Sequence, residues 1–347
     1  MTAGNPGNPL PPNAIEPLNF QSSGSPPQQH FQWPKEHGTR VFSVIMKTFC
    51  IVSALAAVAA LFMITGYIVY KGIDGFFVDW GGHRHWSWEL FTQLPGPSDS
   101  PFGMKSQFIG TAILVGLASI VGIPLGLLCG IYLAEYATKG WFPKTIRTVV
   151  EILASVPSIV IGVVAFELFV INVPSVQGWT GKLLQGLHDV CPVFFMGNFS
   201  GYAGALALAF IMAPIVAVVS EEMLRLVPHS YREASVGVGA SRFQTLVNVV
   251  LPSAAAGIIT GIMLAIARIA GETAPLIFTT VGNDQLILNP AQQMPAVTLK
   301  IWLYSTSADP GWIKQAWSAM LVVVLAVLFF NTLVRLELWR RQKKLQK

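Results

Sequence analysis

The sequence has few charged side chains and few cysteines. Only 11% of its 347 residues are Asp, Glu, Lys or Arg, whereas 53% are hydrophobic, and this balance cannot cover a soluble globule with polar surface. Three cysteines are too few for a disulfide framework. The sequence also has no Gly-x-x-x-x-Gly-Lys-Ser/Thr phosphate loop, which excludes a nucleotide-hydrolysing site of that kind in this chain. An integral membrane protein is therefore the first expectation.

Catalytic and metal-binding patterns are missing as well. His83 and His85 share a hydrophilic loop, but no further ligands of a metal site accompany them, so we expect a solvated loop. The net charge of +5 does not indicate a nucleic-acid partner, because the basic residues stand singly or in short groups beside apolar blocks. We therefore expect a chain with no enzymatic activity, no metal and no cofactor of its own.

Six apolar blocks are present, each near or above the roughly 20 residues that a helix needs to cross a bilayer. The alternation of polar and apolar residues that a membrane β-barrel requires is absent, so the blocks predict transmembrane helices and an all-α, polytopic membrane protein. The predicted spans are Val41–Tyr70, Gln107–Leu133, Ile146–Val173, Tyr202–Val219, Ala254–Thr280 and Ala316–Val334.

The charge of the flanking segments predicts the orientation. Most of the 22 Lys and Arg residues flank the spans on the side of the N-terminus, so both termini are expected in the cytoplasm. Residues 1–40 hold eight of the 23 prolines and are expected to form a disordered cytoplasmic tail. Residues 41–105 would supply the first helix and an outer loop, residues 106–335 the transmembrane domain, and residues 336–347 a basic cytoplasmic tail.

Ionisable residues inside the apolar blocks are the candidate functional residues. Arg268 and Glu272 in the fifth block are four residues apart, so they can pair on one helical face, and an Arg fork suits phosphate-like oxyanions. A purely structural ion pair is the alternative. In the third block, Glu167 can either face the pathway or reach the membrane interface, and Arg147 is expected to form a surface pair with Glu151. Pro157 can kink the same block.

The cytoplasmic loop at residues 221–252 predicts a helix-turn-helix. A helix is expected to begin near Ser230, to break at Gly237 to Gly239, and to resume from Ser241, which can cap the following helix. Such an element either protrudes from the membrane as a rigid docking element or lies flat among the lipid headgroups.

The spacing within this loop resembles the EAA loop of ABC importer permeases. The pattern is Glu233-Ala234-Ser235, three residues, Gly239, nine residues, then Val249-Val250-Leu251-Pro252, with Ser for the third Ala and Val for the usual Ile. The resemblance implies that Glu233, Ala234, Ser235, Gly239, Leu251 and Pro252 couple the chain to a cytoplasmic ATPase subunit. ATP and magnesium would then be bound by that partner.

Three further segments resemble phosphate-importer permeases of the PstA type. They are Gly271-Glu-Thr-Ala-Pro-Leu276 after Arg268, Ile131-Tyr-Leu-Ala-Glu-Tyr-Ala137, and Val156-Pro-Ser-Ile-Val-Ile-Gly162. The resemblance extends over roughly Gln107 to Val334 and implies a type I ABC importer permease fold. It also implies a sister permease subunit, two ATPase subunits, an external phosphate-binding protein, and an influence of Arg268 and Glu272 on the passage of inorganic phosphate.

Three other functions compete with this interpretation. A permease for another oxyanion, such as sulfate or molybdate, would share the EAA loop. A secondary anion transporter or channel would also explain paired charges inside the membrane, but not the EAA spacing. A membrane scaffold without transport activity would pack the charged helical face dry.

Overall fold

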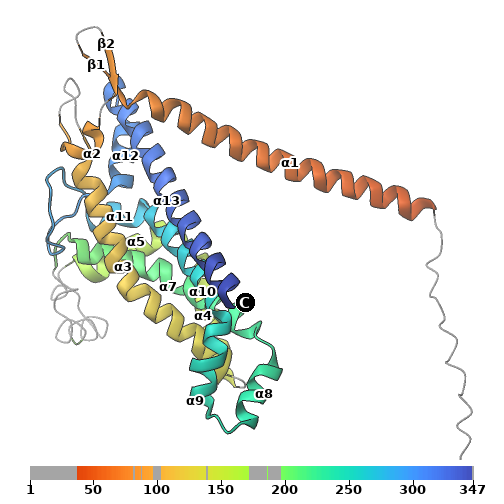
Figure 1. Cartoon of the computed structure of the whole chain (residues 1–347). Coiled ribbons are helices and arrows are strands. Elements are labelled where there is room, and N and C mark those ends of the chain that lie inside the picture. The colour runs from red at the N-terminus through yellow and green to blue at the C-terminus, as the bar shows by residue number, and fades with distance from the viewer. Residues whose placement is uncertain are drawn as a thin grey trace, which may run out of the picture. The chain divides into compact units, whose positions relative to one another are not determined.

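The computed structural model describes residues 37–80, 83–86, 88–96, 103–137, 140–171, 186 and 197–345. Its contacts divide the chain into two units, Met1–Leu61 and Phe62–Lys347. The first unit contributes the beginning of helix α1 (His37–Asp74), so residues 37–40 of the predicted tail are helical. The rest of that tail, residues 1–36, lies outside the described residues. All further elements belong to the second unit (Figure 1).

Five helical runs of the described chain are long and apolar enough to cross a membrane. They are α1, α3 (Lys105–Ile131) with the π-helical turn η1 (Tyr132–Tyr136), α7 (Gly201–Arg225), the run Arg242–Ala270, and α13 (Pro310–Leu345). A sixth span results if the bent pair Trp141–Ser155 and Ser158–Val170 counts as one. The predicted all-α membrane fold is therefore confirmed.

The third predicted span is not a continuous helix. Helix α4 (Trp141–Ser155) and helix α5 (Ser158–Ala165), which the π-helical turn η2 (Phe166–Val170) extends, meet at an angle of 102°. Pro157 lacks a backbone donor and pushes Val156 out of the helical region, where its ψ is 133°. The kink expected at Pro157 is thus a full break, and the prediction of one helix over Ile146–Val173 was wrong.

Small residues let α3 and α7 approach closely. Every fourth residue of α3 from position 110 to 130 is buried, and most of these residues are glycine or alanine. A Cβ atom on Gly126 would lie 2.5 Å from the carbonyl oxygen of Ala213 in α7, and one on Gly130 would lie 2.7 Å from that of Ala217. Helices in lipid associate through such packing rather than through the hydrophobic effect. Helix α7 is buried along most of its length and forms the centre of the bundle.

The fifth block packs on α7 in the same manner and then breaks. Helix α9 (Arg242–Thr245), the π-helical turn η4 (Leu246–Val250) and α10 (Leu251–Ala270) form one run, which places Gly261 against Val219 of α7. The run ends at Ala270, and α11 (Ala274–Thr279) begins after three further residues. The predicted helix over Ala254–Thr280 was therefore wrong at its outer end, where a glycine C-cap precedes a proline in the first turn of α11.

Two clusters of short elements lie at opposite ends of the second unit. Helices α8 (His229–Gly237) and α9 lie at one end, and the short elements of the loops lie at the other (Figure 1). There, strands β1 (Phe77–Trp80) and β2 (His83–Trp86) form an antiparallel hairpin in which Phe77 pairs with Trp86. The sequence pattern had indicated only a hydrophilic loop here, not this hairpin. Helices α2 (Glu89–Thr92) and α12 (Val297–Ser305) complete this end.

Helix α13 is longer than the sequence indicated. It begins at Pro310 and continues to Leu345, so it extends through most of the predicted basic tail at 336–347. Near its start, the hydroxyl of Ser318 donates a hydrogen bond of 3.0 Å to the carbonyl oxygen of Gly72 in α1. A Cβ atom on Gly72 would lie 2.6 Å from Cβ of Leu321, so the last turns of α1 also depend on glycine for close packing.

The close approach of α3 and α7 predicts different effects of alanine at two glycines of α3. Gly126→Ala should lower the stability of the fold by about 1–3 kcal/mol, because its Cβ meets the α7 backbone. Gly116→Ala should be neutral or slightly stabilising, because a Cβ there meets nothing within 4 Å. Thermal unfolding of the purified variants measures both effects. Equal melting temperatures for the two variants would contradict this account of the packing.

Candidate functional site

The helix-turn-helix predicted for the loop at residues 221–252 is present. Helix α8 ends at Gly237, and Gly239 in the turn has a φ of 89°. Residues other than glycine rarely adopt this left-handed backbone conformation. The side-chain oxygen of Ser241 accepts a hydrogen bond from the backbone N–H of Gln244, and the side-chain oxygen of Gln244 accepts one from the backbone N–H of Ser241. This capping box starts α9, so the predicted role of Ser241 is confirmed.

The two arms of this element are held together by two hydroxyl groups. The side chain of Ser235 in α8 lies 2.9 Å from that of Thr245 in α9, which is buried. Glu233, Ala234 and Gly239 are exposed at the outer side of the element. The exposed surface therefore carries three of the six residues expected to couple to an ATPase, whereas Ser235 supports it from within.

Leu251 and Pro252 lie away from this exposed surface. Leu251 is half-buried and packs against an apolar cluster that includes Leu224 and Val250. Pro252 is exposed in the first turn of α10, directly after the π-helical turn η4. These two residues therefore mark the junction between the helix-turn-helix and the long helix α10.

A largely buried arginine fastens α8 to the bundle. Arg232 donates a hydrogen bond of 2.6 Å to the carboxylate of Glu135 in η1, at the end of α3. It also donates to the carbonyl oxygens of Leu224 and Val227, at 2.8 and 2.5 Å, where α7 ends. One guanidinium thus satisfies orphan carbonyls at a helix terminus and an acid on a second helix. A displacement of α8 must move the ends of both α3 and α7 or break these bonds.

A second carboxylate joins α4 to α7 at the same end. The side chain of Glu221 is only 9% exposed, pairs with Arg147 of α4, and pairs with Arg225 one turn further along α7 at 2.9 Å. We expected Arg147 to pair with Glu151 on its own helix, and the structure instead pairs it across to α7. The break at Pro157 makes this possible, because α4 is free to lie across the end of the bundle.

Arg268 and Glu272 form the ion pair that the sequence predicts, but in a different setting. The guanidinium Nε of Arg268 lies 3.6 Å from Oε1 of Glu272. Arg268 is in the last turn of α10, where the helix dipole favours a cation, and Glu272 follows the end of the helix. The carbonyl oxygen of Glu272 accepts a hydrogen bond of 2.9 Å from the hydroxyl of Thr298 in α12. The pair therefore lies at a break in a membrane helix rather than along one helical face.

The side chain of Arg268 is open to its surroundings in this single chain. Its exposed fraction is 49%, compared with 15% for Glu272. Thr260 and Leu264, two turns and one turn before it, are exposed as well, whereas Gly261 and Ala265 are buried against the bundle. Within the described residues, no hydrogen bond or ion pair joins Glu167, which is exposed in η2, to Arg268 or Glu272.

The charged contacts of Arg232 and Glu221 were missed by the sequence analysis. Glu135 and Arg232 are 97 residues apart, and Arg147 and Glu221 are 74 residues apart. Glu135, Arg147 and Glu221 lie near the ends of apolar blocks, and Arg232 lies in the loop at 221–252, but these positions do not identify their partners. In the described part of the chain, no group of three or more His, Cys, Asp or Glu side chains could hold a metal ion.

Comparisons with known proteins agree on one family. Residues 122–336 match the family model of the binding-protein-dependent transport system inner membrane component. The phosphate transport system permease protein PstA of Yersinia pestis is 36% identical over 77% of this chain and 80% of its own length. The proteins of that name from Xylella fastidiosa and Haemophilus influenzae are 37% and 33% identical over 79% and 88% of this chain, and over 85% and 95% of their own lengths.

Two solved structures support the fold. One is a bacterial alginate ABC transporter in complex with a periplasmic protein bound to alginate pentasaccharide, with a TM-score of 0.56 and 14% identity. The alignment covers 89% of this chain and 99% of that one. The second, an ABC transporter that imports alginate, has a TM-score of 0.54 and 18% identity over 85% of this chain and 98% of its own.

The fastening of α8 by Arg232 predicts an energetic coupling with Glu135. In a double-mutant cycle of Arg232→Gln and Glu135→Gln, hydrogen exchange of the α8 amides should give a coupling of about 0.5–3 kcal/mol in the local opening free energy. Arg242→Gln, which removes an exposed arginine of the same helix-turn-helix, is the control and should leave the exchange of α8 unchanged. Additive effects of the two Gln variants would contradict the fastening.

Proposed function

Because this chain belongs to the family of binding-protein-dependent transport system inner membrane components, we propose that it is the permease subunit of an ATP-driven phosphate importer. The observation that supports phosphate as the substrate is the 33–37% sequence identity of this chain to phosphate permeases over most of its length. The membrane-spanning helices and the protruding helix-turn-helix support the transport role.

In this proposal, the end of the bundle that bears α8 faces the cytoplasm, together with both termini. A cytoplasmic ATPase subunit binds the exposed surface around Glu233, Ala234 and Gly239, and hydrolyses ATP with magnesium on its own residues. Closure of two such subunits moves α8, and Arg232 transmits the movement to the ends of α3 and α7. Leu251 and Pro252 transmit it to α10, because they join the helix-turn-helix to that helix.

In this proposal, the movement of α10 changes the position of Arg268 and Glu272, which contact the substrate. From Pro252, sixteen residues of helix place Arg268 roughly 24 Å along α10, far from the α8 end. Broken helices at membrane depth occur where the chain lines a cavity, and a guanidinium binds oxyanions through several donors. Phosphate would compete with Glu272 for the guanidinium of Arg268, so that the carboxylate holds the arginine when no substrate is present.

The exposure of Arg268 also supports a sister permease. A half-exposed guanidinium in contact with lipid is unfavourable by several kcal/mol, with about 2.5–3.5 as the lower bound. Covering by a second permease subunit, with water between the two, removes this penalty and creates the pathway at the same place. The exposed carboxylate of Glu167 is proposed to face this pathway too. An external phosphate-binding protein would deliver the substrate from the side opposite α8.

The alternatives differ in measurable ways. A permease for sulfate or molybdate would import those oxyanions in preference to phosphate. A secondary transporter would work without ATPase subunits and would respond to a protonophore.

In vesicles that contain the permease pair, the ATPase subunits and the external binding protein, we expect ATP-dependent uptake of phosphate that sulfate does not inhibit. Uptake without ATP would contradict the proposal.

Arg268→Gln should lower phosphate import in these vesicles by at least about tenfold, because a hydrogen-bonded charge on the substrate is lost. The chain should still fold and the subunits should still assemble, because the Arg268 side chain is half-exposed in this chain. Arg268→Lys retains the charge but not the planar fork and should give an intermediate rate. Full import by the Gln variant would remove Arg268 from the pathway, and failure of assembly would assign it a structural role.

Gly239→Val should lower the amount of phosphate imported per ATP hydrolysed. A β-branched residue at the left-handed φ of Gly239 costs about 1–2 kcal/mol and should shift the turn that presents α8. Gly237→Val is the matched control, because a Cβ at either glycine meets nothing within 4 Å but only Gly239 has a positive φ. Equal losses in both variants would show that added bulk, and not the left-handed turn, causes the effect.

A further inference from the structure

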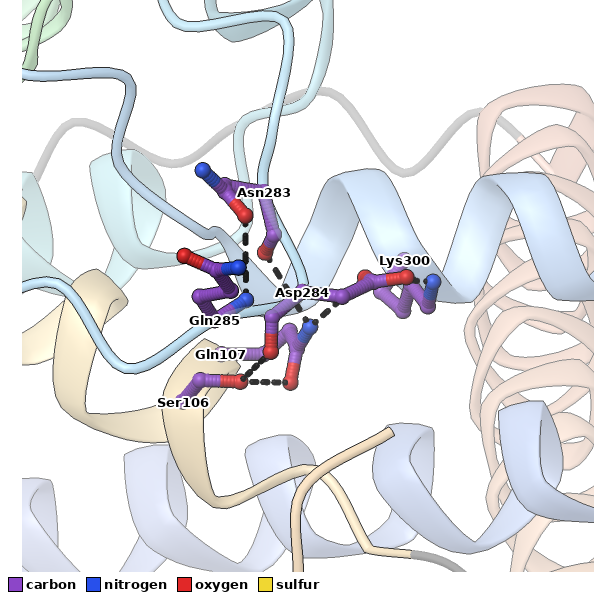
Figure 2. A network of polar contacts seen from close by, with 6 residues as sticks. All are labelled: Ser106, Gln107, Asn283, Asp284, Gln285 and Lys300. Atoms are coloured by element: carbon purple, nitrogen blue, oxygen red, sulfur yellow. Dashed lines mark hydrogen bonds and ion pairs between the residues drawn. The ribbon is translucent and has the colours of Figure 1, made fainter. Parts of the chain in front are cut away.

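A polar pocket lies at the end of the bundle opposite α8 and involves none of the residues assigned above. It has a volume of about 710 Å³ and is formed by the start of α3, the loop at 281–296 and α12. Its polar lining consists mainly of amide side chains around one ion pair (Figure 2). We call it the Lys300 pocket and define it by Gln107, Asp284, Gln285, Gln293 and Lys300.

The two members of the ion pair differ in freedom. Nζ of Lys300 lies 2.6 Å from Oδ1 of Asp284, but the Lys300 side chain is only 10% exposed whereas that of Asp284 is 58% exposed. Lys300 also lies 4.6 Å from the centre of the Tyr304 ring, which holds the ammonium by a cation–π contact. Lys300 is therefore fixed, and Asp284 can turn towards solvent.

Lys300 is the cation of the pocket, and apart from Asp284 the polar residues that line it are neutral. Burial, and secondarily the charge of Asp284, raise the pKa of the Tyr304 phenol, so Tyr304 stays protonated. When Asp284 turns away, the pocket holds one buried positive charge surrounded by amide groups. A buried ammonium without a partner is unfavourable, so the pocket then favours any small anion that reaches it.

A buried amide provides a second donor directed at the same place. Gln107 is 1% exposed, and the hydroxyl of Ser106 donates to its Oε1 at 2.9 Å, which orients the NH₂ group towards Asp284 (Figure 2). Its Nε2 reaches Oδ1 of Asp284 at 3.4 Å and the carbonyl oxygen of Asn283 at 3.5 Å. Both distances are long for hydrogen bonds, so this donor is poorly satisfied by the protein itself.

The loop that carries Asp284 is held in a strained conformation. Val281 has a φ of 58° and Gly282 a φ of 82°. A β-branched residue at positive φ is rare and persists only where the surroundings enforce it, which is typical of ligand clamps and switches. Both residues line the pocket, so the strain is located where the loop meets the ion pair.

We propose that the Lys300 pocket is a second, outer binding site for phosphate, in which the anion takes the place of the Asp284 carboxylate on Lys300 and accepts a hydrogen bond from Gln107. This inference rests on the proposed function, which places this end of the bundle outside the cell. Asp284 occupies the site when phosphate is absent and leaves through its exposed side. The ammonium of Lys300 and the NH₂ group of Gln107 supply the donors that a tetrahedral oxyanion requires.

Substitution of the two residues of the ion pair should have opposite effects on phosphate binding. Binding of labelled inorganic phosphate is measured on the two permease subunits assembled with their ATPase subunits, without the binding protein. This chain contains Arg268→Gln throughout, so that the inner site at Arg268 is removed. Asp284→Asn should tighten binding by about two- to fivefold, because it removes a competing anion from a partly exposed pair. Lys300→Met should weaken binding by at least about tenfold, because the charged donor is lost.

Lys314→Met is the matched control. Lys314 lies 3.5 Å from Asp74 at the same end of the bundle, outside the pocket, and its removal should leave phosphate binding unchanged. Lys300→Arg should restore part of the binding that Lys300→Met loses. Weaker binding in Asp284→Asn, together with a lower melting temperature in both pocket variants, would show that the pair is only a structural clamp and would overturn the proposal.

Two further comparisons are needed. The first distinguishes free phosphate from a lipid headgroup as the ligand, and the second distinguishes failure of the outer site from failure of the proposed function. Binding should be the same in nanodiscs of zwitterionic and of anionic lipid. Loss of binding in anionic lipid would assign the pocket to a lipid headgroup and overturn the proposal. If the assembly with native Arg268 imports phosphate but the Arg268→Gln assembly binds none, only the outer site is wrong. If the native assembly imports no phosphate at all, the proposed function is wrong.

Discussion

The contact between α3 and α7 is the constraint on which the rest of the structure depends. Successive turns of α3 present mainly glycine or alanine, and the α3 and α7 backbones approach so closely that a single added carbon at Gly126 would meet a carbonyl oxygen. In lipid this packing replaces the hydrophobic effect that holds soluble helices together. Helices α10, α4, α5 and α11 then pack around α7, so its position determines theirs.

Helix α3 connects the two polar ends of the bundle. At one end Glu135 holds Arg232 of α8, and at the other Ser106 and Gln107 contact the loop that carries Asp284. A rigid helix between these contacts provides a direct mechanical link between the proposed ATPase surface and the proposed outer phosphate site. The Arg268 and Glu272 pair lies at the end of α10, which packs beside α3 against the same central helix.

Sequence patterns predicted those features that depend on neighbouring residues. The apolar blocks predicted the membrane helices, Ser241 predicted a helix cap, and the glycines at 237 and 239 predicted the turn after α8. Features that depend on distant residues were not predictable in this way. Arg147 pairs with Glu221 of α7 rather than with Glu151 on its own helix, because the chain bends sharply between α4 and α5. Likewise, nothing in the sequence places Asp284 and Gln107 beside Lys300. Proline and glycine also broke the third and fifth blocks more completely than their composition indicated.

The spacing of the small residues on α3 has a mechanical consequence. A repeat of four residues is longer than the roughly 3.6 residues of one helical turn, so the line of contact winds around α3 in a right-handed sense. Straight helices cannot follow such a line over several turns, so α3 and α7 keep their contact only by crossing at an angle or by coiling around each other in a right-handed sense. Sliding of α7 along α3 would move its backbone off the glycines that admit it, so the same contact also fixes the register of the two helices.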